Sequence, residues 1–312
     1  MEHSLTLWVV FNIFIVSMLL VDLMVFNKDP REITIKHSLV WTGLWVVMAV
    51  IFGIGLYFYM SPEQSLHFFT GYLIEKSLSV DNIFVFLLIF TYFGVDPKYQ
   101  HRVLFWGIFG ALFIRLIFIV AGVALIEQFH WVIYLLGAFL IFTGIKLAFE
   151  KDTEIRPHKN PVLKLVRRFL PVTKDFHGEK FFIKQRGKWV ATPMFIVLIM
   201  IETTDVVFAF DSIPAIMAIT RDTFIIYSAN AFAILGLRAL YFALSGVMKL
   251  FHYLHYGVAL ILVYVGTKMM LEELVKIPTL VTLSVILLTI TFSILLSILF
   301  PKKDPPINPD SL

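Results

Sequence analysis

Long apolar stretches follow one another through almost the whole chain, and they constrain its fold more than any other feature. Nine of them are long enough to cross a bilayer as a helix, which takes about 20 residues. Inside lipid every backbone polar group must find a partner within the protein, and a helix satisfies this requirement within one segment. We therefore expect an all-α polytopic membrane protein with nine transmembrane helices, at residues 5–26, 38–60, 67–94, 103–126, 131–149, 191–219, 223–248, 253–272 and 279–300.

The composition also indicates lipid as the main solvent. Of the 312 residues, 59% are hydrophobic and 15% are charged, whereas a soluble domain averages about 25% charged residues. The net charge is +4, but the basic residues concentrate in loops, so we expect no nucleic-acid partner. The chain has no cysteine, which excludes disulfides, thiolate metal ligands and cysteine nucleophiles.

The distribution of Lys and Arg predicts the orientation. Basic residues gather in the loops after the first, third, fifth and seventh spans and in the tail, whereas the other loops hold only Arg221 and Lys276. Basic loops stay in the cytoplasm, so we expect the N-terminus outside and the C-terminus inside. The first span lacks a basic flank and a cleavage site of small residues, and we interpret it as a retained helix rather than a signal peptide.

The loop at residues 150–190 is the one sizeable segment expected outside the bilayer. Its residues 161–170 alternate apolar and basic side chains at helical spacing, which predicts an interfacial helix, and Arg186-Gly187 could turn a short hairpin. We expect this basic loop to contact anionic lipid. The Pro-rich tail, residues 301–312, is expected to be disordered.

Matching polar residues predict an internal repeat. Arg115 matches Arg238, and Gly144-Ile145-Lys146 matches Gly266-Thr267-Lys268, at an offset of 122 or 123 residues. The two units, residues 61–149 and 191–272, would each hold three helices, so the second would enter the membrane the opposite way up. Residues 1–60 would add two N-terminal helices and residues 273–300 a ninth. Such three-plus-three inverted repeats are typical of secondary transporters, although two arginines that arose separately for packing remain an alternative.

Carboxylates inside the third and sixth spans are the candidate metal ligands. A charge at the centre of a spanning helix costs about 2.5–3.5 kcal/mol on the insertion scale, which favours a functional reason for so many. Helical spacing puts Glu75 and Asn82 on one stripe and Glu202 and Asp205 on another. The predicted ligand set is Glu75, Asp81, Asn82, Glu202, Asp205, Asp211 and Ser212.

Basic residues in the same spans would balance part of this charge. The five carboxylates exceed the three cations, Lys76, Arg115 and Arg238, by two charges, which a divalent cation or two protons would neutralise. We expect each arginine to hold the acids of its own repeat. Pro214 lacks an N–H and is expected to break the sixth helix, while Asp22 in the first span is a separate candidate.

The chemistry of the ligands narrows the choice of metal. Carboxylate, amide, hydroxyl and carbonyl oxygens suit Mg²⁺, Ca²⁺ or Mn²⁺. No histidine lies deep in a predicted span, so zinc, copper and nickel are less favoured. The sequence has no P-loop motif either, which disfavours ATP as a driving force within this chain.

Three long motifs resemble the TerC family, and most closely its Alx branch. They are Gly71-Tyr-Leu-Ile-Glu75-Lys-Ser-Leu-Ser-Val-Asp81-Asn82, the segment from Ile201 to Ile216, and Asn230-Ala-Phe-Ala-Ile-Leu-Gly236-Leu-Arg238-Ala-Leu-Tyr241. The resemblance implies a protein of the bacterial inner membrane, manganese export, and a historical link to tellurium resistance. It implies that the acidic residues of the first two motifs lie on the cation path.

The sequence is compatible with two classes of function, a transporter and a partner-recruiting factor. The leading hypothesis is a secondary transporter that exports Mn²⁺, with protons as one option for the coupling ion. We expect no enzyme activity and no resident cofactor, and a homo-oligomer is left open. The alternative is a membrane assembly or stress-resistance factor that recruits partners through the loop at residues 150–190. An intramembrane aspartic protease is disfavoured, because the sequence has no Gly-x-Gly-Asp signature.

Overall fold

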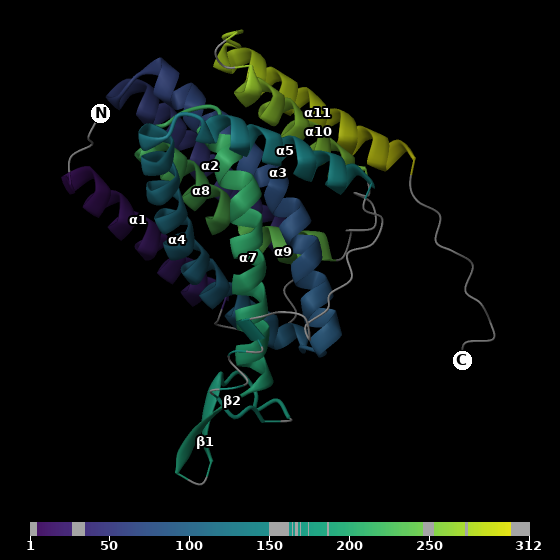
Figure 1. The fold of residues 1–312 in the computed structure, drawn as a ribbon. Helices are drawn as coiled ribbons and strands as arrows, with labels where there is room; N and C mark the ends of the chain where they lie inside the picture. The colour runs from purple at the N-terminus through teal and green to yellow at the C-terminus, as the bar shows by residue number, and fades with distance from the viewer. Residues whose placement is uncertain are drawn as a thin grey trace.

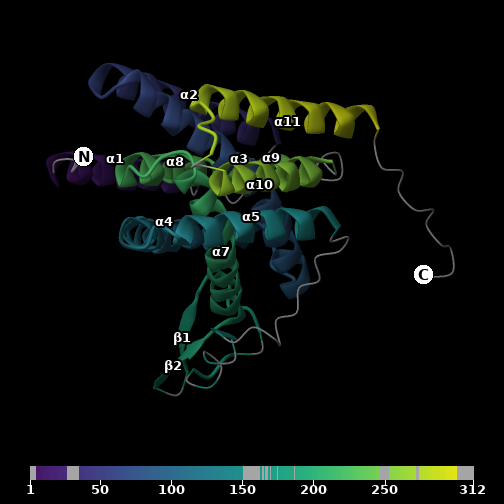
Figure 2. The same ribbon diagram turned by 45° about the horizontal axis from the view of Figure 1, so that its top comes forward.

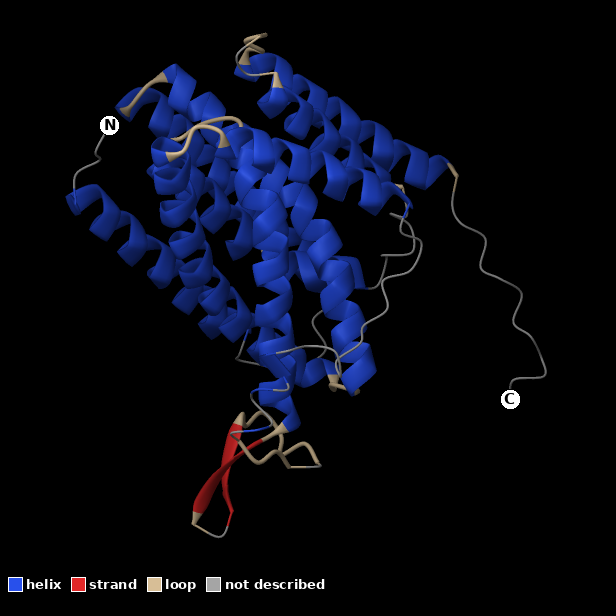
Figure 3. Ribbon diagram, viewed as in Figure 1, coloured by secondary structure: helices blue, strands red, loops and turns tan. Residues whose placement is uncertain are grey.

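A computed structural model describes residues 5–26, 35–149, 170–245, 253–271 and 274–300, apart from residues 174 and 186, and isolated positions between 162 and 168. Each of the nine predicted spans coincides with a helix in this part of the chain (Figures 1 and 3). The seventh span is divided at Gly236 into two helices. The helices are α1 (Leu5–Phe26), α2 (Ile35–Tyr59), α3 (Pro62–Phe93), α4 (Pro97–Gln128), α5 (Val132–Phe149), α7 (Pro193–Met217), α8 (Thr223–Leu235), α9 (Leu237–Ser245), α10 (Leu254–Met270) and α11 (Thr279–Leu299).

Seven segments of the described chain are long and apolar enough to cross a membrane: α1, α2, α4, α5, α7, α8 together with α9, and α11. Helix α10 is apolar but shorter. Helix α3 is 32 residues long and carries Glu75, Lys76 and Asp81 in its middle. The charged helix is thus held among apolar ones, which is the arrangement expected when polar groups face the interior of a membrane bundle.

Helix boundaries follow from local chemistry. Asp96 accepts a hydrogen bond from the backbone N–H of Lys98 ahead of Pro97, and Asp222 accepts from Phe224 and Ile225 at the start of α8. The hydrogen bond from the Lys98 side chain lowers the pKa of Asp96, which lies outside the spans. Gly94 ends α3 at φ +65°, a conformation that favours glycine.

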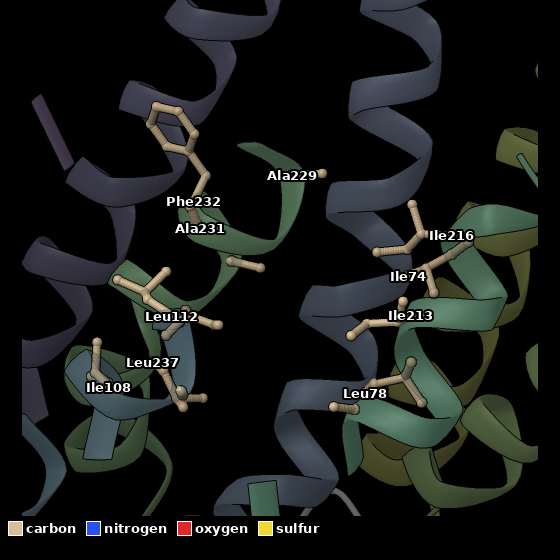
Figure 4. Packing of buried hydrophobic residues seen from close by; sticks show 14 of the residues in the cluster. Ile74, Leu78, Ile108, Leu112, Ile213, Ile216, Ala229, Ala231, Phe232 and Leu237 are labelled. Atoms are coloured by element: carbon tan, nitrogen blue, oxygen red, sulfur yellow. The ribbon is translucent and has the colours of Figure 1, made fainter. Parts of the chain in front are cut away.

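Helices α3, α4, α7 and α8 form the centre of the molecule. Helix α3 packs against α7 and α8, and α4 packs against the same two helices. Figure 4 shows Ile74 and Leu78 of α3 facing Ile213 and Ile216 of α7. The residues of α8 are buried from Phe224 to Leu235, so this helix has no lipid-facing side.

The directions of the central helices can be read from their contacts. Three residues, 94–96, join α3 to α4, so these two helices run in opposite directions. Helices α4 and α7 run in the same direction, because Gly107 of α4 lies beside Ile201 and Gly122, further along, lies beside Met217. Helices α3 and α7 are therefore antiparallel.

Helices α5, α10 and α11 lie to one side of this centre. Figure 2 shows α5 beside α10 and α11 beyond it. Helices α5 and α10 approach closely at glycines: a Cβ built on Gly137 would lie 3.0 Å from the carbonyl oxygen of Gly266, and one on Gly144 would lie 2.7 Å from that of Ala259. Small residues of this kind let membrane helices come into backbone contact.

A β-hairpin projects from the end of the molecule where α7 begins (Figures 1 and 3). Strands β1 (Phe182–Gln185) and β2 (Lys188–Ala191) pair antiparallel, and the turn between them contains Gly187 at φ +79°. Arg102 of α4 pairs with Glu179 at 2.8 Å, and the ring of Phe182 contacts Phe195 of α7. The hairpin is therefore anchored to both α4 and α7. The interfacial helix predicted at residues 161–170 lies largely outside the described residues.

Candidate functional site

Arg115 of α4 lies at the centre of the bundle with 1% of its surface exposed. Its Nη2 lies 3.0 Å from Oδ1 of Asp205, and its Nε donates to Oδ2 of the same carboxylate at 3.2 Å. Its Nη1 pairs with Oε1 of Glu75. The guanidinium thus forms a two-pronged contact with one acid and bridges it to a second, which a lysine could not do in the same geometry.

Two neutral side chains complete the shell around Arg115. Asn230 of α8 accepts from Nη1 at 2.7 Å, and Ser212 of α7 lies 3.4 Å from the same nitrogen. The amide of Asn230 is held in place because its Nδ2 donates to the carbonyl of Ile226. Helices α3, α4, α7 and α8 each contribute one or more of these groups, and we call Glu75, Arg115, Asp205, Ser212 and Asn230 the arginine centre.

The arginine centre retains unused hydrogen-bonding capacity. Glu75 is fully buried, and its Oε2 has no hydrogen-bond partner among the described residues. Ser79, one turn along α3, is also buried, and its hydroxyl is likewise without a described partner. A buried polar atom without a partner costs about 1–3 kcal/mol. These oxygens are therefore groups that a bound cation or a water molecule would satisfy.

A small cavity of about 10 Å³ adjoins Asp205. Such a volume is close to the minimum that holds one water molecule. Of the described residues that line it, Asp205 alone carries a charge; the others are Phe86, Leu104, Gly107, Ile108, Ala111, Ile201, Ile234 and Leu237. The arginine centre thus has a space beside it of the size of a single water molecule or small ion.

Glu202 lies one turn before Asp205, against the surface of Gly110 in α4. A Cβ on Gly110 would collide with the Glu202 carboxylate, so the missing side chain makes room for this acid. The Oε2 of Glu202 is buried and has no described hydrogen-bond partner. Glu202 is therefore a third carboxylate, close to the arginine centre but without a described hydrogen bond to it.

Asp211, another predicted ligand, lies toward α5 rather than at Arg115. Asp211 faces Thr143 and Lys146 of α5, and Asn82 is buried in α3. The side chain of Asp81 lies outside the described part of the chain. Among the described residues, no three acidic or histidine side chains are close enough to hold a metal ion together. Of the predicted ligands, Glu75, Asp205 and Ser212 are the described residues that meet at Arg115.

The two buried arginines have different partners from those we expected. Arg115 binds acids from both predicted repeats, and in the described part of the chain Arg238 forms an ion pair with Asp22 of α1 at 2.7 Å. Lys76 donates to the carbonyl of Ala233 at 3.3 Å, next to the helix interruption at Gly236. Pro214 lies inside α7, which continues to Met217, so the interruption occurs in the following span instead.

Sequence reasoning did not single out Asn230 as part of the site. A signal existed, since an asparagine in the middle of an apolar span needs a polar partner. What the sequence could not tell was the rotation of α8, which decides whether this amide faces Arg115 or lipid.

Together, the bundle of apolar helices and the charged centre inside it define a polytopic integral membrane protein with a polar site at the level of the bilayer. The chain belongs to the family described as integral membrane protein TerC, whose model matches residues 60–305. Helices α1 and α2 lie before the matched region, so the ion pair between Asp22 and Arg238 joins an N-terminal helix to the family's common part.

Relatives match along almost the full length. An uncharacterized membrane protein of Myxococcus xanthus, STKORF319, is 46% identical over 98% of this chain and 96% of its own length. The Alx proteins of Salmonella typhi and Escherichia coli K12 are 44% and 42% identical over 92% of this chain and 93% of theirs. Both carry the provisional description of a membrane-bound redox modulator. No solved structure matches the chain.

Proposed function

We propose that this protein is a secondary transporter that exports a divalent metal cation, Mn²⁺ in the first place, through the arginine centre. The observation that carries the proposal is the meeting of Glu75 from α3 and Asp205 from α7 at one buried arginine. Hard oxygen ligands of this kind suit Mn²⁺, Mg²⁺ and Ca²⁺. The resemblance to the TerC family favours manganese among them.

The packing of equivalent helices supports an inverted repeat. Helices α3 and α7 are antiparallel, as the first helices of two inverted units must be. An offset of 122 residues relates Gly137 to Ala259 and Gly144 to Gly266. The contact of Gly137 with Gly266 and that of Gly144 with Ala259 are therefore counterparts of each other. A pair of matching contacts across one interface is what a twofold relationship produces.

In this mechanism Arg115 substitutes for the cation when the site is empty. Two carboxylates buried without a counter-charge would be strongly unfavourable, and the guanidinium supplies that charge in the conformation described. An arriving dication would replace Arg115 at one or both acids, using the unbonded oxygens of Glu75 and Glu202. When the repeats move and the cation leaves, Arg115 would return. Protons that compete for the same carboxylates would couple release to the pH gradient.

The provisional description of the relatives as redox modulators cannot mean thiol–disulfide exchange by this chain. With no cysteine, thiol–disulfide exchange cannot be carried out by its own side chains. A redox effect of this protein would have to arise indirectly, for example through the concentration of a redox-active metal such as manganese.

The alternative, a factor that recruits partners through the loop, has one structural feature in its favour. The hairpin projects from the bundle, and its Trp189 is 65% exposed. A recruiting factor should lose its activity when Trp189 and Lys184 are both changed to serine, whereas a transporter should keep its cation flux.

The proposal is tested by Mn²⁺ uptake into inside-out membrane vesicles. We expect Glu75→Gln and Asp205→Asn to lower uptake by about tenfold or more, because each removes a charged ligand worth more than about 1.4 kcal/mol. Glu63→Gln is the matched control, since Glu63 lies on the same helix with its side chain 79% exposed. Uptake by the two site variants equal to that of Glu63→Gln would rule out the arginine centre as the transport site.

A further inference from the structure

The cavity beside Asp205 lies on the hairpin side of Arg115. Its α4 lining residues, Leu104 to Ala111, come before Arg115 in a helix that starts near the hairpin. Its residues from α8 and α9, Ile234 and Leu237, come after Asn230 in the segment that runs toward the same end. Figure 4 shows Leu237 near Ile108 of α4. The cavity therefore points from the arginine centre toward the hairpin end.

A hydrogen bond joins α9 to α4 beyond the cavity, on the hairpin side. The hydroxyl of Tyr241 in α9 donates to Oε1 of Gln100 in α4 at 2.8 Å, and Nε2 of Gln100 donates to the carbonyl of Val95 at 3.0 Å. The ring of Phe90 packs edge-on against Tyr241. Each residue lies further toward the hairpin end than the cavity residue of its own helix. Both Tyr241 and Gln100 are buried, and they lie between the cavity and the hairpin end.

The helix that carries Tyr241 is separated from α8 by an interruption. Gly236 lies between α8 and α9, and a Cβ there would come within 2.9 Å of the Lys76 ammonium and 3.2 Å of Trp45. Lys76 donates to the carbonyl of Ala233, in the last turn of α8. Helix α9 is thus a nine-residue element attached at a glycine, and its Arg238 is held by Asp22 of α1.

We propose that the hydrogen bond between Tyr241 and Gln100 is a latch that closes the hairpin-side entrance of the cation path, and that α9 moves about Gly236 to open it. This inference rests on the proposed function for its purpose. Its physical content, a gate between the surface and the cavity, is separate and can be measured without any cation.

The absence of cysteine in the chain gives a direct test. A single Leu104→Cys places a thiol in the cavity wall, where the native side chain is 1% exposed. Its reaction rate with a charged methanethiosulfonate reports opening of the latch in the purified protein. We expect Tyr241→Phe to raise this rate about fivefold, the factor for one net hydrogen bond in the open–closed equilibrium.

A matched control is available in α8. The hydroxyl of Tyr227 donates to Asn12 at 2.8 Å, and Tyr227 is also buried, so Tyr227→Phe removes a similar bond outside the proposed latch. It should leave the Leu104→Cys rate unchanged. A thiol at Ile119, which is buried beyond Arg115 in α4, reports general loosening. Its rate should stay the same in Tyr241→Phe.

Gln100→Met breaks the same hydrogen bond from the α4 side and provides a second variant if Tyr241→Phe folds poorly. A rise at Leu104→Cys alone in either folded variant supports the latch. Unchanged reactivity, or an equal rise at Ile119→Cys, overturns it, whatever the Mn²⁺ flux. If the wild-type protein carried no Mn²⁺ flux, the proposed function would be overturned. The labelling result would still decide whether the latch exists.

Discussion

Arg115 binds two acids with one planar group, and its replacement therefore separates two effects. Without the guanidinium, Glu75 and Asp205 lose their buried counter-charge, and loss of one partner of a buried ion pair typically costs about 3–5 kcal/mol. The same loss leaves both carboxylates available to a metal. A structural arginine would show the first effect alone.

We predict that Arg115→Met lowers the thermal stability of the metal-free protein and raises its affinity for Mn²⁺ about tenfold, because the cation no longer competes with a tethered charge. The half-saturating Mn²⁺ concentration in a thermal-shift titration measures this. Arg102→Met is the control, since Arg102 pairs with Glu179 at the surface and should leave the Mn²⁺ titration unchanged. Equal or weaker Mn²⁺ binding by Arg115→Met would show that Arg115 does not occupy the cation's place.

Individual site residues could be anticipated only where the helix pattern alone decides their position. The spacing of Glu75 and Asp205 predicted inward-facing acids on α3 and α7, and these two do meet. The partner of Arg238 could not be inferred, because periodicity defines the face of a helix but not which helix lies opposite. Asp22 is separated from Arg238 by 216 residues, and no local rule connects them.

At the level of elements, the contact between α5 and α10 depends on the absence of side chains. A Cβ at Gly144 would lie 2.8 Å from a methyl group of Val263 and 3.0 Å from its backbone nitrogen. Neither neighbour can move far, since one belongs to a β-branched side chain and the other to the backbone. The two helices would have to separate to admit even an alanine.

We predict that Gly144→Ala destabilises the protein by about 1–3 kcal/mol, the usual cost of overpacking. Gly43→Ala in α2 is the matched control, because a Cβ there has nothing within 4 Å; it should be neutral or stabilise by up to about 1 kcal/mol. Midpoints of unfolding in detergent measure both. A Gly144→Ala midpoint equal to that of Gly43→Ala would mean that the α5–α10 contact is looser than described.

The positions of the spans were predictable because lipid imposes a length and a composition on each helix. The interruption at Gly236 was not expected, and Pro214 was predicted to break a helix that continues to Met217. Pro214 lacks an N–H, so one backbone hydrogen bond of α7 is lost. Only one further turn follows before the helix ends at Met217, and the loss of this single bond does not interrupt the helix. At Gly236, by contrast, tertiary contacts with Lys76 and Trp45 surround the interruption, and these contacts are invisible in a linear pattern.

At the scale of the whole molecule, the two ends differ in their number of basic residues. The hairpin end has more, namely Lys98, Arg102, Lys184 and Lys188. The opposite end, where α3 and α11 begin, has Arg221 and Lys276. The positive-inside rule then predicts that the hairpin lies in the cytoplasm. In that orientation the latch between Tyr241 and Gln100 would close the cytoplasmic entrance, the side from which an exported cation must arrive.

Labelling of single cysteines in spheroplasts tests this orientation. Leu274 is 81% exposed between α10 and α11, and Lys184 is exposed on the hairpin. We predict that a membrane-impermeant thiol reagent labels Leu274→Cys in intact spheroplasts and Lys184→Cys only after permeabilisation, with the cysteine-free parent as the blank. The reverse pattern would place the latch on the outer side. The cation would then leave through the cavity, and it would reach the arginine centre from the end opposite the hairpin.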